Sequence, residues 1–195
     1  RNNLITLAGG NVSVRMPNGD IIITASGMNY EDMTTDDFIV FDKDKNIIEG
    51  TRRTSVDTPA LFHIYDNMPN VNAILHTHQP YATAVGLISD ELPACLTTLA
   101  NTTLGAVNVA PYAPPGNLSM GELTVDYIGE RLAVIMKHHG VIAVGEDLHQ
   151  ALYAAVYLEI SAQTYLAAAA VKEPALLTKE QNDECAEIFK RVGQK

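Results

Sequence analysis

The sequence predicts an α/β protein in which helices pack on a largely antiparallel sheet. Two observations lead to this prediction. The first quarter of the chain contains β-branched segments joined by turn residues, and the remainder alternates short apolar segments with segments of helical periodicity. The chain has 195 residues and contains no repeat, low-complexity tract or linker, so we expect residues 1–195 to form a single domain.

Two hairpins are expected at the start of the chain. Residues 10–16 and 20–26 are β-branched runs on either side of the turn sequence PNGD at residues 17–20. Residues 38–50 form a second pair of such runs, with the turn at residues 44–45. Because each pair is joined by a short turn, these strands should lie antiparallel.

The middle of the chain is expected to change from helix to strand and back. Residues 55–69 begin with capping residues and carry apolar side chains at helical spacing, so the helix should end before Pro69. The apolar run at residues 71–78 predicts a strand. Pro80 then suits the first turn of a helix that should continue to about Ser89.

The last part of the chain is expected to contain two strands and three helices. Residues 105–112 form a strand, residues 119–132 a helix, and residues 133–145 a strand broken at a His-His-Gly sequence. Residues 146–171 form a long helix with small side chains along one face, which suits close packing on a sheet or a subunit. An amphipathic helix at residues 178–192 closes the chain.

Composition excludes several classes of partner. The net charge is −10 and no basic cluster is larger than Arg52-Arg53, which argues against nucleic acid. No apolar run is long enough to cross a bilayer, so no membrane contact is expected.

Cys95 and Cys185 lie in no metal or redox spacing, and we expect reduced thiols and a cytoplasmic location. The chain begins at Arg1 rather than Met, so we expect an N-terminal segment to precede it.

Two histidines at the end of an apolar run suggest a metal site. His76 and His78 are separated by one residue in an expected strand, so both side chains should leave the same face and can reach one ion. A catalytic zinc site needs about three protein ligands and one open position. The simpler interpretation is a pair of histidines that only form hydrogen bonds near a sheet edge.

A third ligand would come from the His-His-Gly sequence. His138 and His139 interrupt an otherwise apolar strand, and the following Gly140 permits an unusual backbone turn. Neighbours on a strand face opposite ways, so one of the two histidines should point at the site. His63 and His149 lie in expected helices and suit packing or surface positions.

Two loops have the residues of an anion site. Residues 7–13 and 24–29 combine glycine with Asn, Ser and Thr donors, a combination that can offer N–H groups to phosphate. Each loop can equally be an ordinary tight turn. Ser55 and Asp57 stand at the start of an expected helix, where an N-cap is the simpler role for Asp57.

Taken in order, these segments resemble the class II aldolase/adducin family, which includes L-fuculose-1-phosphate aldolases and L-ribulose-5-phosphate 4-epimerases. The resemblance extends from about Leu4 to Lys190 and rests on the ordered sequences AGGNVSVR, TASGM, TSVDTP, VNAILHTH, VAPYAPPG and KHHGVIAVG. It implies a three-layer α/β/α sandwich around a mainly antiparallel sheet. It also implies a homotetramer with the active site at a subunit interface.

The resemblance assigns roles to eight residues. It implies a metal site for Zn²⁺, with Mn²⁺ and Co²⁺ as alternatives, formed by His76, His78 and His139. It implies a catalytic carboxylate at Asp57. The implied phosphate-binding residues are Asn11, Ser26, Gly27 and Ser55.

The resemblance implies an aldolase that acts on a phosphorylated sugar. Such an enzyme cleaves a ketose phosphate to dihydroxyacetone phosphate and an aldehyde through a metal-stabilised enediolate, with Asp57 as the base beside the metal. An L-ribulose-5-phosphate 4-epimerase activity is the first alternative, and a keto-acid phosphate decarboxylase is compatible with the same site. A non-catalytic binding module is a further alternative, against which the three retained histidines argue.

Several positions depart from the family pattern. Asp57 stands where the aldolases carry Glu and the epimerases carry Asp followed by Thr-Pro, as here, whereas Asn101 replaces an acidic residue of the epimerases. Thr97 and Val192 occupy positions where the family carries proton-donating tyrosines, and Val56 replaces a serine of the phosphate loop. Candidates for the missing proton donor are Tyr81, Tyr112 and Tyr127.

Overall fold

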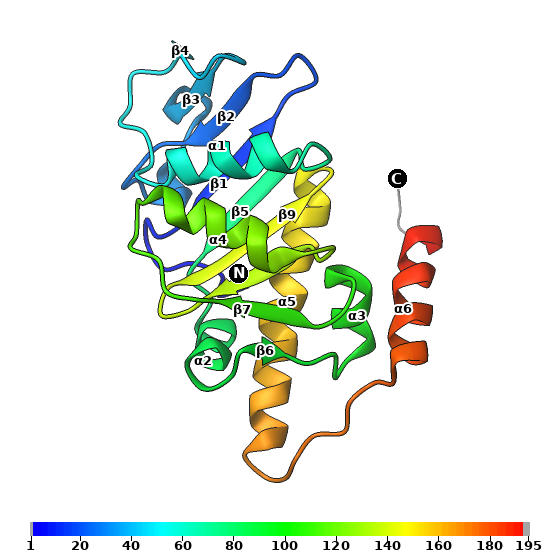
Figure 1. Ribbon diagram of the computed structural model, residues 1–195. Helices are drawn as coiled ribbons and strands as arrows, with labels where there is room; N and C mark the ends of the chain where they lie inside the picture. Colours follow the sequence, from blue (N-terminus) through cyan, green and yellow to red (C-terminus); the bar gives the residue numbers. More distant parts are fainter. Residues whose placement is uncertain (1, 193–195) are drawn as a thin grey trace.

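In residues 2–192, which the computed structural model describes, nine strands form one sheet at the centre of the protein (Figure 1). In chain order the strands are β1 (Asn11–Arg15), β2 (Ile21–Thr24), β3 (Phe38–Phe41), β4 (Ile47–Glu49), β5 (Ala73–Thr77), β6 (Glu91–Leu92), β7 (Val107–Ala110), β8 (Ala133–Met136) and β9 (Gly140–Gly145).

The sheet is mixed but mainly antiparallel, as the sequence predicts. Its strand order is β4-β3-β2-β1-β5-β9-β8-β7-β6. Within the described part of the chain, only β7 and β8 run parallel. The register shifts between Val40 and Phe41, where β3 meets the exposed edge strand β4. Both expected hairpins are present, as β1–β2 and β3–β4.

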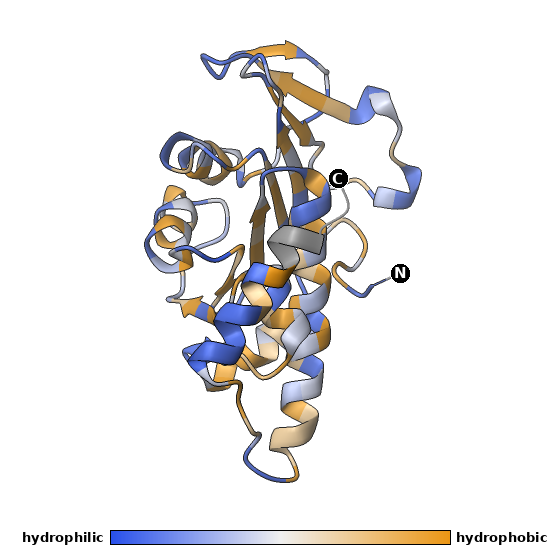
Figure 2. Cartoon of the chain, turned by 90° about the vertical axis from the view of Figure 1, so that its right-hand side faces the viewer, coloured by the Kyte–Doolittle hydropathy of each residue, from blue (hydrophilic) through white to orange (hydrophobic). Residues whose placement is uncertain are grey.

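Helices cover both faces of the sheet, which confirms the three-layer arrangement. One apolar cluster joins α1 and α4 to one face, and a second joins α2, α3 and α5 to the other. Figure 2 shows the sheet edge-on between these layers, and α6 packs against α3 (Figures 1 and 2). The helices are α1 (Thr58–Asn67), α2 (Pro80–Ile88), α3 (Thr97–Thr103), α4 (Leu118–Ile128), α5 (Leu148–Ala169) and α6 (Lys179–Val192).

Side-chain alternation along β5 decides where its histidine points. Ile74 belongs to the cluster under α1 and α4, whereas Ala73 and Leu75 belong to the cluster on the opposite face. Since successive side chains on a strand leave opposite faces, His76 shares the face of Ile74. In register, His76 lies opposite Asn11 of β1 and Ile142 of β9. The pairing therefore places residues of β1 and β9 on either side of His76, near the C-terminal end of β5 in the middle of the sheet.

Short elements that the sequence did not predict are also present. The helix α3 consists mostly of threonines, which have low helix propensity. Burial of Leu99 and Ala100 stabilises it, and the hydroxyls of Thr102 and Thr103 donate to carbonyls one turn earlier and so do not remain unpaired. Other unpredicted elements are β6 and two 3₁₀ turns at Tyr30–Asp32 and Thr35–Asp37.

Both cysteines, Cys95 and Cys185, are free. None of the helices in residues 2–192 has the length and apolar character needed to cross a membrane.

The small face of α5 packs on the sheet through Ala151, Ala154 and Ala155. Packing on the sheet within the chain therefore accounts for the small side chains along this face of α5.

The crossing of α1 and α4 depends on a glycine. A Cβ atom at Gly121 of α4 would lie 2.5 Å from the carbonyl oxygen of Ala60 and 2.9 Å from its Cα atom. Backbone atoms cannot move aside as a flexible side chain can. Close packing of these two helices matters for the site because Asp57 immediately precedes α1.

We predict that Gly121→Ala will lower the free energy of unfolding by about 1–3 kcal/mol, because the added methyl group overpacks the helix crossing. Urea denaturation followed by circular dichroism measures this change. Glu122→Ala, at an exposed neighbouring position of the same helix, is the control and should change stability by less than about 0.5 kcal/mol. Equal stability of the two variants would show that α1 and α4 can separate without cost.

Candidate active site

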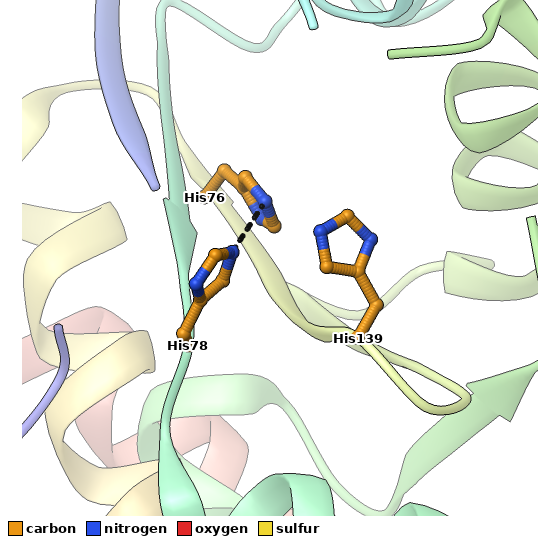
Figure 3. Close-up of side chains that lie close together, drawn as sticks. All are labelled: His76, His78 and His139. Atoms are coloured by element: carbon orange, nitrogen blue, oxygen red, sulfur yellow. Dashed lines mark hydrogen bonds between the residues drawn. The ribbon is translucent and has the colours of Figure 1, made fainter. Parts of the chain in front are cut away.

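Three imidazoles converge beside β5 (Figure 3). His76 lies on β5, His78 follows that strand, and His139 lies in the turn that precedes β9. The Nε2 atoms of His76 and His78 are 3.2 Å apart. One nitrogen from each of the three rings lies within 4.8 Å of the other two. This cluster is the set of metal ligands that the sequence predicts.

A hydrogen bond orients the His76 ring. Its Nδ1 atom lies 3.1 Å from the carbonyl oxygen of Val141 on β9. A carbonyl can only accept, so Nδ1 carries the proton and donates it. The Nε2 atom is then left with a lone pair directed toward the other two rings, as a metal ligand requires.

The surroundings keep the three histidines neutral. Burial lowers the pKa of His76 to about 4 and is opposed by the nearby Asp57 carboxylate. Burial is also the main cause of the lowered pKa values of His78 and His139. Neutral imidazoles can coordinate a metal, whereas protonated imidazoles cannot. All three rings are therefore available as ligands at neutral pH.

Close backbone packing places His78. Its backbone N–H donates to the carbonyl oxygen of Leu4 over 2.9 Å. A Cβ atom at Gly9 would lie 2.9 Å from Nδ1 of His78, and a Cβ atom at Gly140 would lie 2.2 Å from the carbonyl oxygen of Thr77. The Gly-Gly sequence of the first loop therefore leaves space for the ligand ring, in addition to any role toward an anion.

The turn between β8 and β9 separates the two neighbouring histidines. His138 adopts the left-handed conformation, with φ of 63°, and is exposed. The backbone N–H of His139 donates to the carbonyl oxygen of Met136 over 3.0 Å. This tight turn directs His139 toward His76, so that one of the pair reaches the site, as predicted from the sequence.

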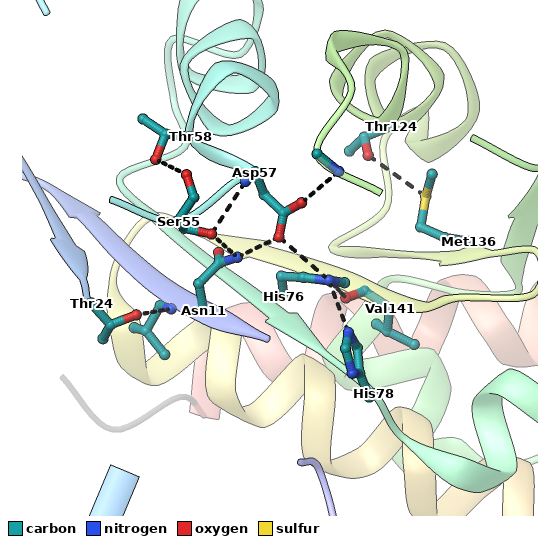
Figure 4. Close-up of polar contacts among 12 residues, drawn as sticks. Asn11, Thr24, Ser55, Asp57, Thr58, His76, His78, Thr124, Met136 and Val141 are labelled. Carbon is teal, nitrogen blue, oxygen red and sulfur yellow. Dashed lines mark hydrogen bonds and ion pairs between the residues drawn. The ribbon is translucent and has the colours of Figure 1, made fainter. Parts of the chain in front are cut away.

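Asp57 adjoins the triad and is not used as a helix cap (Figure 4). It occupies the N-cap position of α1, yet its side chain makes no capping hydrogen bond. Its Oδ2 atom accepts from Asn11 Nδ2 over 2.9 Å and lies 3.9 Å from His76 Nε2. Its Oδ1 atom accepts from the backbone N–H of Gly116 over 3.1 Å. The simpler interpretation of Asp57 as an N-cap is therefore wrong.

The residues expected to bind phosphate divide into two groups. Asn11 and Ser55 are buried and in contact, with Asn11 Nδ2 donating to Ser55 Oγ over 3.2 Å. Ser26 is held beside the segment before Ser55, since its N–H donates to the carbonyl oxygen of Arg53 over 2.9 Å. Gly27 is exposed with φ of 70°. The backbone N–H of Ser26 is thus engaged, and its hydroxyl is the donor that remains.

The sequence analysis did not identify Gly116 as a site residue. Its N–H holds one oxygen of Asp57, and its φ of 73° belongs to the left-handed region. The Pro-Pro-Gly sequence at residues 114–116 was a signal for a turn with positive φ, although it does not indicate which side chain that turn would meet.

Of the described residues at the departing positions, Asp57 is the one with a contact to the triad. Thr97 is exposed at the start of α3, and the Oδ1 atom of Asn101 on that helix is buried without a partner. Val56 is exposed, and the side chain of Val192 lies outside the described side chains. In the described part of the chain, no hydrogen bond joins the triad to any of the candidate donors Tyr81, Tyr112 and Tyr127.

The residues present fit a divalent metal ion. Three neutral imidazoles suit zinc, and they also suit other first-row metals. The Nδ1 atom of His139 is buried without a hydrogen-bond partner, an arrangement that a bare protein avoids. With three ligands the set leaves coordination positions open, as in a catalytic rather than a structural site.

Comparison with protein families gives one match over most of the chain. Residues 1–166 match the model described as the class II aldolase and adducin N-terminal domain. This match includes the three histidines, Asp57 and Asn11.

Individual relatives include both aldolases and an epimerase. The chain is 30% identical to a 5-deoxy-D-ribulose 1-phosphate aldolase of Bacillus thuringiensis serovar kurstaki over 95% of this chain and 87% of that protein. It is 32% identical to the L-ribulose-5-phosphate 4-epimerase UlaF of Salmonella paratyphi B over 82% of this chain and 75% of that protein. A solved L-fuculose 1-phosphate aldolase has a TM-score of 0.91 and 30% identity, covering 96% of this chain and 89% of its own.

We predict that His76→Ala will abolish stoichiometric zinc binding, because the best-oriented ligand is lost. Metal analysis after dialysis against zinc measures the content. His138→Asn is the matched control, since Asn tolerates the left-handed conformation and His138 is not part of the triad. It should retain one zinc ion per chain. Retention of zinc by the His76 variant would refute the ligand assignment.

Proposed function

Because the chain belongs to the class II aldolase and adducin family, we propose that it is a zinc-dependent aldolase that cleaves a ketose phosphate to dihydroxyacetone phosphate and an aldehyde. Metal-dependent aldolase or epimerase chemistry follows from the family and the three-histidine site. The specific reaction and the choice of zinc are our proposal. One observation supports it most: a buried carboxylate, Asp57, adjoins the triad without serving as a helix cap.

The proposed reaction needs a base beside the metal site. Cleavage begins when a proton leaves the hydroxyl on the carbon that becomes the aldehyde, and the electrons of the broken C–C bond pass to the carbonyl end of the substrate. Bound zinc supplies a Lewis acid that stabilises the negative charge formed there. Asp57 is the group proposed to accept the proton, because Asn11 and Gly116 hold its two oxygens in a defined orientation.

We propose that the phosphate group lies against Ser55 and the loop of Ser26 and Gly27. By the family resemblance Asn11 belongs to the same set. The hydroxyl of Ser55 accepts from Asn11 Nδ2 and from the N–H of Asp57, so its own proton is left to be donated. Binding the phosphate here would fix the reacting carbons relative to Asp57, which is how remote binding energy contributes to rate.

An epimerase is the second candidate, and one observation favours it. Asp57-Thr58-Pro59 matches the epimerase pattern, and Asp is shorter than the Glu of the aldolases. Epimerisation uses the same bond cleavage, followed by rejoining of the two fragments on the other face of the aldehyde. The amide of Asn101 argues against it, because an amide cannot exchange a proton at neutral pH.

We also propose a homotetramer. The family resemblance implies this assembly, and the chain exposes several large apolar side chains, among them Leu7 at 77%, Ile88 at 71% and Val171 at 88% exposure. A partner subunit would cover such residues. It would also offer a source for the proton donor, which the triad lacks in the described part of this chain.

A product assay tests the proposed activity. Zinc-loaded protein would be incubated with L-fuculose 1-phosphate, 5-deoxy-D-ribulose 1-phosphate and L-ribulose 5-phosphate, and the products would be separated. We expect release of dihydroxyacetone phosphate from at least one ketose 1-phosphate. Conversion of the ribulose phosphate to its epimer without triose release would establish the epimerase instead. No turnover of any substrate would refute both.

We predict that Asp57→Asn will retain zinc but lose turnover by about 100-fold or more, because an amide cannot accept the proton. Zinc content and kcat for the substrate found above are the measurements. Asp66→Asn, on the exposed side of α1, serves as the matched control and should leave both unchanged. Full activity of the Asp57 variant would remove this residue from the mechanism.

A further inference from the structure

Glu159 is a buried carboxylate on α5 that the proposed reaction does not use. It is 4% exposed, and none of the ion pairs in the described part of the chain includes it. Its oxygens accept from two backbone N–H groups, Oε1 from Tyr81 over 3.0 Å and Oε2 from Ala82 over 2.9 Å. Both donors belong to the first turn of α2, which lies beside α5 (Figure 1). The carboxylate therefore caps a helix other than its own.

The start of α2 leaves these two N–H groups without a partner inside the helix. Pro80 has no N–H, and the N–H of Thr83 is the first to reach a carbonyl one turn earlier, that of Gln79 over 3.1 Å. The residue before a helix commonly supplies the cap, but the side chain of Gln79 does not. A carboxylate also suits the positive end of the helix dipole. Glu159 thus supplies from α5 a cap that the local sequence of α2 lacks.

Gln79 forms a second link to α5. Its side chain is fully buried, with Nε2 donating to the carbonyl oxygen of Ala155 over 3.0 Å and Oε1 accepting from the hydroxyl of Thr77 over 2.6 Å. Ala155 and Glu159 are four residues apart and therefore lie on the same face of α5. The same helix packs on β5 and β9. Residues 79–82 are thus held at two points against a helix that is itself fixed to the sheet.

This segment directly follows His78, the metal ligand with the fewer restraints on β5. His78 lies beyond the end of the strand, and in the described part of the chain its ring has no hydrogen-bond partner except Nε2 of His76. That contact joins two metal ligands and is lost when both nitrogens coordinate. The position of His78 then depends on its backbone, which Leu4 holds on one side and residues 79–82 hold on the other.

We propose that Glu159 is a positioning residue for His78: by holding the first turn of α2 against α5, it keeps the backbone of this ligand in place for the metal. The inference rests on the metal site of the proposed function, but not on the reaction or the substrate. Residues that orient a metal ligand from outside the coordination shell commonly change metal affinity by about 10- to 100-fold when they are replaced.

Zinc affinity tests this role without turnover. Glu159→Gln keeps the shape of the side chain but sets an amide N–H₂ group against a backbone N–H, so that two donors meet. We expect its Kd for zinc, measured by competition with a chromophoric chelator, to rise by about tenfold or more. Asp147→Ala is the matched control, because it removes a carboxylate that caps α5 itself, at the other end of β9 from His139. It should lower the urea midpoint but change the zinc Kd by less than about twofold.

A second ligand variant separates positioning from loss of stability. In the His78→Ala background, Glu159→Gln should change the zinc Kd by less than about twofold, because the ligand that Glu159 positions is already absent. General loosening of the fold would raise the Kd in both backgrounds. The visible spectrum of the Co²⁺-substituted protein should likewise change on Glu159→Gln in the wild-type background and stay the same in the His78→Ala background.

If Glu159→Gln does not fold, Glu159→Asp replaces it, because a side chain shorter by one carbon keeps the charge but cannot reach both N–H groups. A folded variant with the zinc Kd and Co²⁺ spectrum of the wild type would overturn the proposal, as would equal effects in both backgrounds. A wild-type protein that binds no zinc would refute the metal site and this inference with it. Zinc binding without release of dihydroxyacetone phosphate would refute the aldolase alone, and the zinc titrations would still decide the role of Glu159.

Discussion

The register of β5 between β1 and β9 is the constraint on which the site depends. That register sets His76 opposite Asn11 on one side and Ile142 on the other, while the carbonyl of Val141 fixes the tautomer of the His76 ring. A slip by one residue would turn His76 to the opposite face of the sheet. The apolar residues that alternate along β5, such as Ile74 and Leu75, oppose such a slip because both faces are buried.

Much of the fold could be predicted from local sequence. The hairpins, the five longer helices and the break at His138-His139 follow from turn residues, periodicity and caps. The helix α3 could not, because tertiary burial overrides the low helix propensity of its threonines. The parallel pairing of β7 with β8 also depends on long-range packing that a local sequence pattern does not indicate.

The site was predictable where spacing along one strand determines geometry, as for His76 and His78. Strand alternation alone left the choice between His138 and His139 open, and the family resemblance made it. The backbone donor at Gly116 was not foreseeable, because its contact with Asp57 crosses from one loop to another. The position of Asp57 at a helix start was predicted correctly, but the local sequence favoured a helix cap, and the catalytic role that the family resemblance implies stays a prediction.

The edge strand β4 has a consequence for association of the protein. Ile47 and Ile48 are more than half exposed there, and an apolar edge strand of this kind can recruit strands from other chains. Two features oppose such recruitment: β4 has three residues, and the register shift at Val40 and Phe41 disrupts the ladder behind it. Growth of the sheet into aggregates is thereby discouraged at this edge of the sheet.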